Sequence, residues 1–405
     1  MANLLYLVHR LPFPPNKGDK LRSYHLLRHL QLNHRVFLGT FVDKPEDMVF
    51  VPDVQRLCPD AYIEQLRPAG VLFRRLAGLM FGRSLTVATF TSRRMQAWVD
   101  RILDKHRIDA CVVVSSAMAS YLDRQPRAPK LLLDVVDVDS AKWRRFSQVR
   151  PWPLSWVFSR EARLLQQHER AVARLAASTF LVTERESALF REVAPEAANK
   201  VRTLGNGVDG AYFSPDVSSH SPFEPGERTV VFVGTMDYWP NADAAIWFAK
   251  EVLPLLHQTW PDLTFHVVGR NPSTGVRALK SAHVRVTGEV ADVRPYLRNA
   301  DVVVAPMRVS PGLPNKVLEA MSCGQPVVIS RACAQVLGPG EDAGLLTAEL
   351  ATEFVLQITR LLESPVLKAS LGLRARTFVE QQYRWDAQMA VLDQHLPAAT
   401  EGLHA

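Results

Sequence analysis

Residues 312–328 read Gly312-Leu313-Pro314-Asn315-Lys316-Val317-Leu318-Glu319-Ala320-Met321-Ser322-Cys323-Gly324-Gln325-Pro326-Val327-Val328. This pattern predicts a turn, a short helix, a tight break at Gly324 and then a buried strand. Pro314 suits the first turn of the helix, because the N–H group that proline lacks would be unpaired there anyway. The order of helix, turn and strand is typical of an α/β fold.

The start of this predicted helix has the chemistry of a nucleotide site. The free backbone N–H groups of a first helical turn attract anions, and Asn315 and Lys316 lie there. Glu319 lies about one turn further on, where a carboxylate can accept hydrogen bonds from sugar hydroxyls. A phosphate at a helix start and a carboxylate for a ribose, at the end of a parallel strand, is the arrangement of a nucleotide site.

On either side of this stretch, short apolar runs alternate with helical patterns. In the first half we predict strands at 4–8, 36–40, 110–115, 131–136 and 179–183, the last being the final main strand, with helices that include 21–32 and 95–106. In the second half we predict strands at 230–233, 264–268, 284–286, 301–305 and 326–329, with helices at 242–256, 293–299, 316–322, 350–362 and 367–382. This alternation predicts two Rossmann-like, doubly wound α/β domains that face a cleft, with the site in that cleft.

A segment without periodicity separates the two halves. It contains Ser214-Pro215, a Ser-Ser-His-Ser run and the stretch from Pro222 to Pro225, which is typical of a linker. We predict an N-terminal domain over residues 1–208, an interdomain linker over 209–228 and a C-terminal domain over 229–383. A C-terminal tail over 384–405 follows, with packing back on the N-terminal domain as one option.

Composition narrows the class of protein. The chain has 405 residues, a formal net charge of +7 and a pI of about 9.3, which favours anionic partners without choosing among them. Its four cysteines are far apart, which favours a reduced, cytoplasmic protein. The apolar run from Leu4 to Val8 is too short for a signal peptide, and no stretch of about 18 uncharged apolar residues predicts a transmembrane helix.

Two polar segments follow predicted strands of the first half. Gly18 would let a ligand approach the backbone after the first strand, and Lys17 would add a charge for phosphate; a solvated turn is the alternative. Asp137 and Asp139 follow the strand at 131–136, where carboxylates are costly to bury without partners. They indicate a site that faces the cleft, and a helix N-cap role for Asp139 or Ser140 is the alternative.

Strand ends of the second half carry further candidates. Gly234 and Thr235 open the second domain at a strand-to-helix turn, and Asn241 can cap the helix that follows. Arg270 follows the next strand and could direct its guanidinium toward a base or phosphate, with a surface role as the alternative. Arg308 follows the strand at 301–305 and is expected on the nucleotide side.

Several of these motifs resemble family 4-type glycosyltransferases with the GT-B architecture. The resemblance rests on Gly312-x-x-Asn315-Lys316-x-Leu318-Glu319-Ala320, on Asn206-Gly207-Val208-Asp209 followed by Phe213, and on the run from Gly234 to Asn241. It spans nearly the whole chain. Within that family the chain looks most like the sugar transferases associated with exosortase-type, PEP-CTERM exopolysaccharide systems of bacteria.

The resemblance implies a function and a set of residues. It implies a hexosyltransferase-type enzyme that moves a sugar from a nucleotide diphosphate sugar to a glycan or lipid-linked acceptor in exopolysaccharide biosynthesis, with retention of configuration. The nucleotide sugar is a co-substrate; no cofactor, metal or nucleic acid is expected. The implied catalytic residues are Asp137, Asp139 and Glu319, and the implied donor-binding residues are Lys17, Gly18, Gly234, Thr235, Arg270, Arg308, Gly312, Leu313, Asn315, Lys316 and Glu319.

The chain departs from the family pattern at Pro311. Many relatives carry a first Glu there, with seven residues between it and the position of Glu319, and they also carry an Arg and a Lys after the first strand of the second domain. Pro311 leaves open a non-catalytic assembly subunit that binds nucleotide sugar. Two further alternatives do not depend on Pro311: a nucleotide-sugar epimerase of the same architecture, and a membrane-docking scaffold.

Two stretches combine arginine with large apolar residues. Residues 67–83 contain Leu72, Phe73, Met80 and Phe81, and residues 144–160 contain Trp152, Trp156 and Phe158. Arginine together with tryptophan suits a membrane interface, and packing on the domain's own core is the alternative. Peripheral contact with the inner face of the membrane would fit a lipid-linked acceptor.

Overall fold

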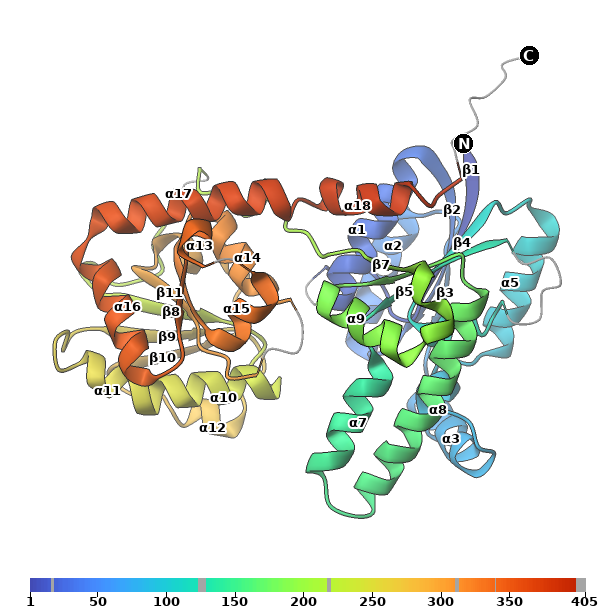
Figure 1. Cartoon of the computed structure of the whole chain (residues 1–405), viewed down its shortest axis with the longest axis horizontal. Coiled ribbons are helices and arrows are strands. Elements are labelled where there is room, and N and C mark those ends of the chain that lie inside the picture. The colour runs from blue at the N-terminus through green and yellow to red at the C-terminus, as the bar shows by residue number, and fades with distance from the viewer. Residues whose placement is uncertain (16–17, 123–128, 217–219, 310–312, 339, 398–405) are drawn as a thin grey trace. The chain divides into compact units, whose positions relative to one another are not determined.

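The computed structural model describes residues 1–15, 18–122, 129–216, 220–309, 313–338 and 340–397. Lys17, Pro311 and Gly312 lie outside these ranges. The chain forms two compact units, Met1–Gly205 with Gln388–Ala405, and Asn206–Ala387. The first boundary therefore lies three residues before the predicted limit at 208. Both units are α/β, as Figure 1 shows.

The first unit contains a seven-stranded sheet in which every neighbouring pair is parallel. Its strands are β1 (Ala2–Val8), β2 (His34–Val42), β3 (Tyr62–Gln65), β4 (Ala110–Val114), β5 (Lys130–Val136), β6 (Ser178–Leu181) and β7 (Val201–Thr203), in the order β3-β2-β1-β4-β5-β6-β7. Its helices are α1 (Gly18–Asn33), α2 (Val51–Leu57), α3 (Pro68–Met80), α4 (Leu85–Thr89), α5 (Arg93–Lys105), α6 (Ser116–Ala119), α7 (Asp139–Val149), α8 (Leu154–Leu175) and α9 (Glu184–Val193), with 3₁₀ turns at Pro45–Phe50 and Pro195–Lys200.

The second unit contains a six-stranded parallel sheet in the order β10-β9-β8-β11-β12-β13. Its strands are β8 (Thr229–Val233), β9 (Thr264–Val268), β10 (Val284–Gly288), β11 (Val302–Ala305), β12 (Val327–Ser330) and β13 (Leu345–Ala348). Its helices are α10 (Trp239–Trp247), which continues through a π-turn at Phe248–Val252 into α11 (Leu253–Leu256), α12 (Thr274–Arg277), α13 (Arg294–Asn299), α14 (Asn315–Ser322), α15 (Arg331–Leu337), α16 (Ala351–Glu363) and α17 (Pro365–Gln382), with a 3₁₀ turn at Glu341–Ala343. The chain returns to the first unit within α18 (Trp385–Asp393).

Strand order reverses once in each sheet, which decides where ligands can bind. In the first unit the reversal lies between β1 and β4, and in the second it lies between β8 and β11. In open parallel sheets the crevice beyond the carboxyl ends of the strands at such a reversal is the usual binding position. The residues that follow β1, β4, β8 and β11 are therefore the first ones to consider.

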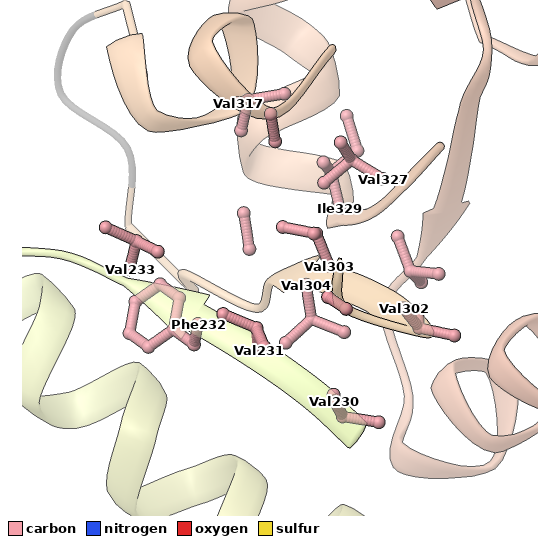
Figure 2. Close-up of a cluster of buried hydrophobic side chains, with 14 of the residues drawn as sticks. Val230, Val231, Phe232, Val233, Val302, Val303, Val304, Val317, Val327 and Ile329 are labelled. Atoms are coloured by element: carbon pink, nitrogen blue, oxygen red, sulfur yellow. The ribbon is translucent and has the colours of Figure 1, made fainter. Parts of the chain in front are cut away.

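The hydrophobic core of the second unit fixes helix α14 at the carboxyl ends of the strands. Figure 2 shows Val317 of α14 in the same buried cluster as Val303 of β11 and Ile329 of β12. All three side chains are at most 3% exposed. Full burial of an aliphatic side chain contributes about 1.5–3 kcal/mol, so α14 is anchored by its apolar face while its first turn stays at the strand ends.

Several sequence predictions need correction. The strand at 179–183 is not the last of its unit, because β7 follows it at the edge of the sheet. Also missed were β3, β13, α15 and α18. Pro314 is the residue before α14 rather than part of its first turn, and Asn241 does not cap α10, which has Tyr238 at its N-cap. Val138, not Asp139 or Ser140, is the N-cap of α7.

Gly269 is predicted to tolerate no side chain. Its φ is +144°, and a Cβ there would overlap the carbonyl oxygen of Gly234. We expect Gly269→Ala to lower the free energy of unfolding by more than about 3 kcal/mol, because it combines backbone strain with displacement of neighbouring backbone. Gly226→Ala is the control: its φ is +83°, and no described heavy atom lies within 4 Å of the added Cβ. Urea denaturation of both variants checks this, and equal losses would contradict it.

Candidate functional site: the carboxyl ends of β8 and β11

The first turn of α14 meets the end of β8 at the reversal point of the second sheet. Gly234 directly follows β8, and its N–H donates to the carbonyl of Val268 at 2.9 Å. A Cβ on Gly234 would lie 2.9 Å from Lys316 Nζ and 2.8 Å from Asn241 Nδ2. The sequence analysis assigned Gly234 and Lys316 to one site from motifs 82 positions apart, and the fold brings them into contact.

Lys316 is held by neighbours that leave no carboxylate in direct contact with it. Its Nζ donates to Asn241 Oδ1, lies 3.5 Å from Met307 Sδ and sits 4.8 Å from the centre of the Phe232 ring. Asn241 in turn donates from Nδ2 to the carbonyl of Thr235 at 2.9 Å. The described ion pairs include none to this lysine, so its charge is available to an anionic ligand.

Burial shifts the pKa values of two groups on α14 in opposite directions. Desolvation lowers the pKa of Lys316 to about 8, and desolvation raises the pKa of Glu319 to about 7. Each partner's charge partly opposes the effect of burial on the other. Strongly shifted groups of this kind cluster at functional sites, because a fold keeps costly charges where a ligand compensates them.

Asn315 adds an unsatisfied acceptor at the same helix start. Its side-chain Oδ1 is buried and has no hydrogen-bond partner within the described ranges. A buried acceptor without a partner costs about 1–3 kcal/mol, so such atoms in native folds call for an explanation. A ligand hydroxyl or N–H group would satisfy it.

Other predicted donor-binding residues lie in different surroundings. Leu313 is partly buried and packs against the core beside α14. Arg270 is partly buried directly after Gly269, at the end of β9. Arg308 is exposed and forms an ion pair with Asp243, with its Nε 3.0 Å from Asp243 Oδ2. Arg308 is therefore already neutralised by a carboxylate, unlike Lys316.

In the first unit, Asp137 and Asp139 share one lysine. Lys142 Nζ lies 2.8 Å from Asp137 Oδ2 and 3.2 Å from Asp139 Oδ1. Desolvation lowers the pKa of Lys142, but the two carboxylates outweigh it and raise that pKa overall. Asp137 Oδ1 is buried without a partner among the described residues. The preceding Val136 has a φ of +69°, an uncommon conformation for a β-branched residue, and such strain clusters at functional sites.

His9 is a candidate that the sequence analysis missed. It directly follows β1, at the reversal point of the first sheet. Its Nδ1 is buried without a partner among the described residues, and its ring packs edge-on against Phe90. Burial, assisted by the neighbouring Arg10, lowers its pKa, which favours the neutral form of the ring. A polar residue directly after an apolar strand is the signal that could have identified it.

Gly18 is the first residue of α1 and is exposed. The next residue, Asp19, accepts from Arg10, whose Nη1 lies 2.6 Å from Asp19 Oδ2 and whose Nε lies 2.9 Å from Asp43 Oδ2. Desolvation raises the pKa of Asp19, but Arg10, His9 and the backbone N–H of Lys20 together outweigh it and lower that pKa overall. Arg10, which follows β1, thus forms ion pairs with Asp19 at the start of α1 and with Asp43, which follows β2.

Metal binding has no candidate cluster in this part of the molecule. Across the described ranges, no group of three or more His, Cys, Asp or Glu side chains lies close enough to hold a metal ion. Likewise, none of the helices in those ranges is both long and apolar enough to cross a membrane. The chemistry that the second unit offers is therefore a partly buried cation, a carboxylate and a helix start at one strand edge.

Comparison with family models finds a match within the second unit. Residues 227–364 match the family model described as glycosyl transferases group 1. Over 230 residues the chain is 29% identical to a phosphatidyl-myo-inositol mannosyltransferase of Mycolicibacterium smegmatis. The matched region is 55% of this chain and 56% of that protein. The similarity thus spans about half the length of this curated relative.

Comparison of structures covers both units. Sucrose-phosphate synthase from Thermosynechococcus elongatus matches with a TM-score of 0.68 at 18% identity, over 98% of each chain. Anabaena HepE in complex with UDP matches with a TM-score of 0.65 at 16% identity, over 98% of this chain and 99% of that chain. The predicted fold class is confirmed: the chain has the fold of GT-B glycosyltransferases, and its residues 227–364 are similar to glycosyl transferases group 1.

Proposed function

We propose that this protein is a glycosyltransferase that moves a sugar from a nucleotide diphosphate sugar to a glycan or lipid-linked acceptor. The observation that carries the proposal is the cation at the strand edge: Lys316 Nζ would lie 2.9 Å from a Cβ on Gly234, at the start of α14. A diphosphate fits this position, because it would meet a lysine, a helix N-terminus and a glycine that lets it approach the backbone.

Glu319 and Asn315 would hold the rest of the donor. Glu319 lies one turn after the start of α14, where its carboxylate would accept hydrogen bonds from ribose hydroxyls. The buried Oδ1 of Asn315 would accept from a further hydroxyl or N–H group of the donor. Arg270 and Thr235, at the ends of β9 and β8, are proposed to lie on the nucleotide side.

Transfer breaks the bond between the sugar C1 and the diphosphate oxygen, and it forms a bond between C1 and an acceptor oxygen. The acceptor hydroxyl gives its proton to the departing diphosphate, which leaves with the bonding electron pair. The transition state is oxocarbenium-like, as in glycoside hydrolysis, so stabilisation of the departing negative charge is the main task of the protein. We propose that Lys316 stabilises this negative charge. Asp137, Asp139 and His9 are proposed to lie on the acceptor side.

The finer assignments follow from the motif resemblance. We extend the proposal to retention of configuration and to bacterial exopolysaccharide biosynthesis of the exosortase-associated kind. A lipid-linked acceptor is supported by the similarity to a phosphatidyl-myo-inositol mannosyltransferase, and a uridine donor is the first to test because HepE was crystallised with UDP and with UDP-glucose. We propose a position at the cytoplasmic face of the membrane.

A thermal-shift titration tests the donor site. UDP, GDP, ADP and TDP would be added to wild type and to Glu319→Ala. We expect one nucleotide to raise the Tm of wild type by about 5 °C at a hundredfold excess over its Kd, because it binds only the native state. Glu319→Ala should lose most of that shift. If none of the four nucleotides shifts the wild type, the donor-site assignment is wrong.

The pKa values on α14 predict how nucleotide affinity depends on pH. Lys316, with a pKa of about 8, must be protonated to bind phosphate, and Glu319, with a pKa of about 7, accepts hydrogen bonds best as a carboxylate. The affinity should therefore peak between about pH 7 and 8, and fall by up to about tenfold for each pH unit above the peak. Lys316→Arg should abolish the alkaline fall, since guanidinium stays protonated. Calorimetric titration at several pH values measures this; an unchanged alkaline limb in the variant would contradict it.

A further inference from the structure

One end of the first unit exposes an unusual number of large apolar side chains. We define the basic–aromatic end as residues 67–83, which include α3, and residues 144–160, which join α7 to α8. Figure 1 shows α3 and the hairpin of α7 and α8 at the same end of this unit. The exposed large apolar side chains of these two stretches are Leu72, Phe73, Leu76, Met80, Phe81, Phe146, Val149, Trp152, Leu154 and Trp156.

Polar contacts fix the two stretches to each other. Arg160, in α8, donates from Nη2 to the carbonyls of Gly78 at 3.0 Å and Leu79 at 3.1 Å, at the end of α3. The next residue, Glu161, is fully buried and accepts from Ser84 Oγ at 2.6 Å and from the backbone N–H of Leu85 at 2.6 Å. Charge-assisted bonds of this kind are strong, so α8 holds both the end of α3 and the start of α4, which follows α3 in the chain.

The outer side of α3 is apolar although the helix also packs inward. Leu72, Leu76 and Met80 follow one another at intervals of four and are 60%, 52% and 79% exposed. Residues at this spacing share one helix face. The inner side contains Gly78, which is buried, and Val71, which packs against the core of the unit. The exposed stripe is therefore a second apolar face that the described fold leaves uncovered.

The tip of the hairpin of α7 and α8 also exposes large apolar side chains. Trp152 is 80% exposed and Trp156 is 56% exposed. Tryptophan has an apolar ring with one N–H donor, and it is favoured where hydrocarbon meets water. The alternative reading of the sequence, in which these stretches pack on the core of their own domain, does not hold for these side chains.

Charge distinguishes this end from an ordinary apolar patch. The two stretches contain eight arginines, Arg67, Arg74, Arg75, Arg83, Arg144, Arg145, Arg150 and Arg160, and no aspartate or glutamate. The whole chain, by comparison, has 41 acidic residues to 48 basic ones. A surface that is basic and rich in Trp, Phe and Leu is complementary to anionic headgroups above an apolar layer.

We propose that the basic–aromatic end docks on an anionic phospholipid bilayer. The exposed arginines Arg67, Arg83, Arg145 and Arg150 would lie among the headgroups. Trp152, Trp156, Phe73 and the α3 stripe would enter the boundary with the acyl chains. Such shallow, reversible binding needs both apolar area and charge, and this surface supplies both. The proposal deepens the membrane contact proposed above, and it holds without any transfer reaction, so the two can fail separately.

Vesicle co-sedimentation without nucleotide tests the proposal. One probe is vesicles of phosphatidylcholine alone. The other is phosphatidylcholine vesicles with about 40% phosphatidylglycerol, because basic segments bind membranes that are rich in anionic lipid. We expect binding only to the anionic vesicles, with an affinity that falls at high salt. Binding should also shift the tryptophan emission to shorter wavelength.

Two variants and a control separate the contribution of charge from that of apolar contact. Arg67, Arg83, Arg145 and Arg150 are exposed, so replacing all four by Gln should leave the fold intact. Each basic residue near an anionic surface contributes about fivefold in affinity, so we expect this variant to bind at least about 100-fold more weakly. Phe73→Ser with Trp152→Ser and Trp156→Ser should lose most binding and the emission shift. Leu350→Ser with Leu356→Ser and Val366→Ser changes equally exposed apolar residues of the second unit and should bind like wild type.

Three results would overturn the proposal. Equal binding of wild type to neutral and anionic vesicles would exclude the charge complementarity. Loss of binding in the control variant as large as in the Phe73, Trp152 and Trp156 variant would assign the contact to general apolar exposure. No binding to either kind of vesicle, by protein that still shows a nucleotide-induced rise in Tm, would remove the membrane surface while leaving the donor site in place.

Discussion

Lys316→Met should slow sugar transfer by about 10²–10³-fold while leaving the protein folded. The lysine would stabilise the negative charge that develops on the departing diphosphate, and the loss of one such preorganised donor typically has an effect of this size. Its surroundings strengthen the effect, since Phe232 and Met307 exclude water from the Nζ group. Rate measurements at saturating donor give the comparison.

Stability and a matched lysine provide the controls for this variant. Burial lowers the pKa of Lys316, so the charged form is costly in the folded state, and its removal should leave Tm unchanged or slightly higher. Lys280→Met removes an exposed lysine of the same unit and should transfer sugar at the rate of wild type. A Lys316→Met enzyme with a normal rate would refute the role given to this lysine.

A large stability effect is expected at Asp134. Its carboxylate receives Arg22 Nε at 2.6 Å and Nη2 at 2.9 Å, and both side chains are at most 2% exposed. Arg22 also donates to the carbonyl of Gly205 at 3.1 Å, at the last residue before the chain leaves the unit. Asp134→Asn would leave the buried guanidinium without its counter-charge, which should cost about 3–5 kcal/mol in the free energy of unfolding.

A surface pair and a double variant distinguish burial from charge as the cause. Asp53→Asn breaks the exposed ion pair with Arg56 and should cost less than about 1 kcal/mol. Arg22→Met combined with Asp134→Leu should recover much of the loss, because apolar side chains of similar size remove the unpaired charge. Urea denaturation of the four proteins measures these differences, and a double variant less stable than Asp134→Asn would contradict the explanation.

The sequence predicted most central elements because their patterns are local. The apolar runs of β1, β4, β8 and β9 and the helix at α14 agree with the structure to within a few residues. β7, with three residues, is too short to show a pattern. The helix break at Gly324 was predicted from its position, and its φ of +73° is the physical reason for the glycine.

The sequence predicted the part of the site that lies in one continuous motif, but not the contacts between distant segments. Glu319 and Lys316 belong to a continuous motif, so one stretch of sequence reveals both. The contact of Lys316 with Asn241 joins residues 75 positions apart and depends on the order of strands, which periodicity does not reveal. His9 was missed because a single histidine after a strand has no motif around it.

Hydrogen exchange with and without UDP tests the central claim most directly, because it locates the ligand as well as detecting it. We predict slower exchange in peptides that cover residues 234–241 and 313–322, where Gly234, Lys316 and Glu319 lie, and unchanged exchange in peptides from α16 and α17. The same protection should be absent in Glu319→Ala. Protection confined to other segments of the second unit, or equal protection in the variant, would contradict a nucleotide diphosphate site at the start of α14.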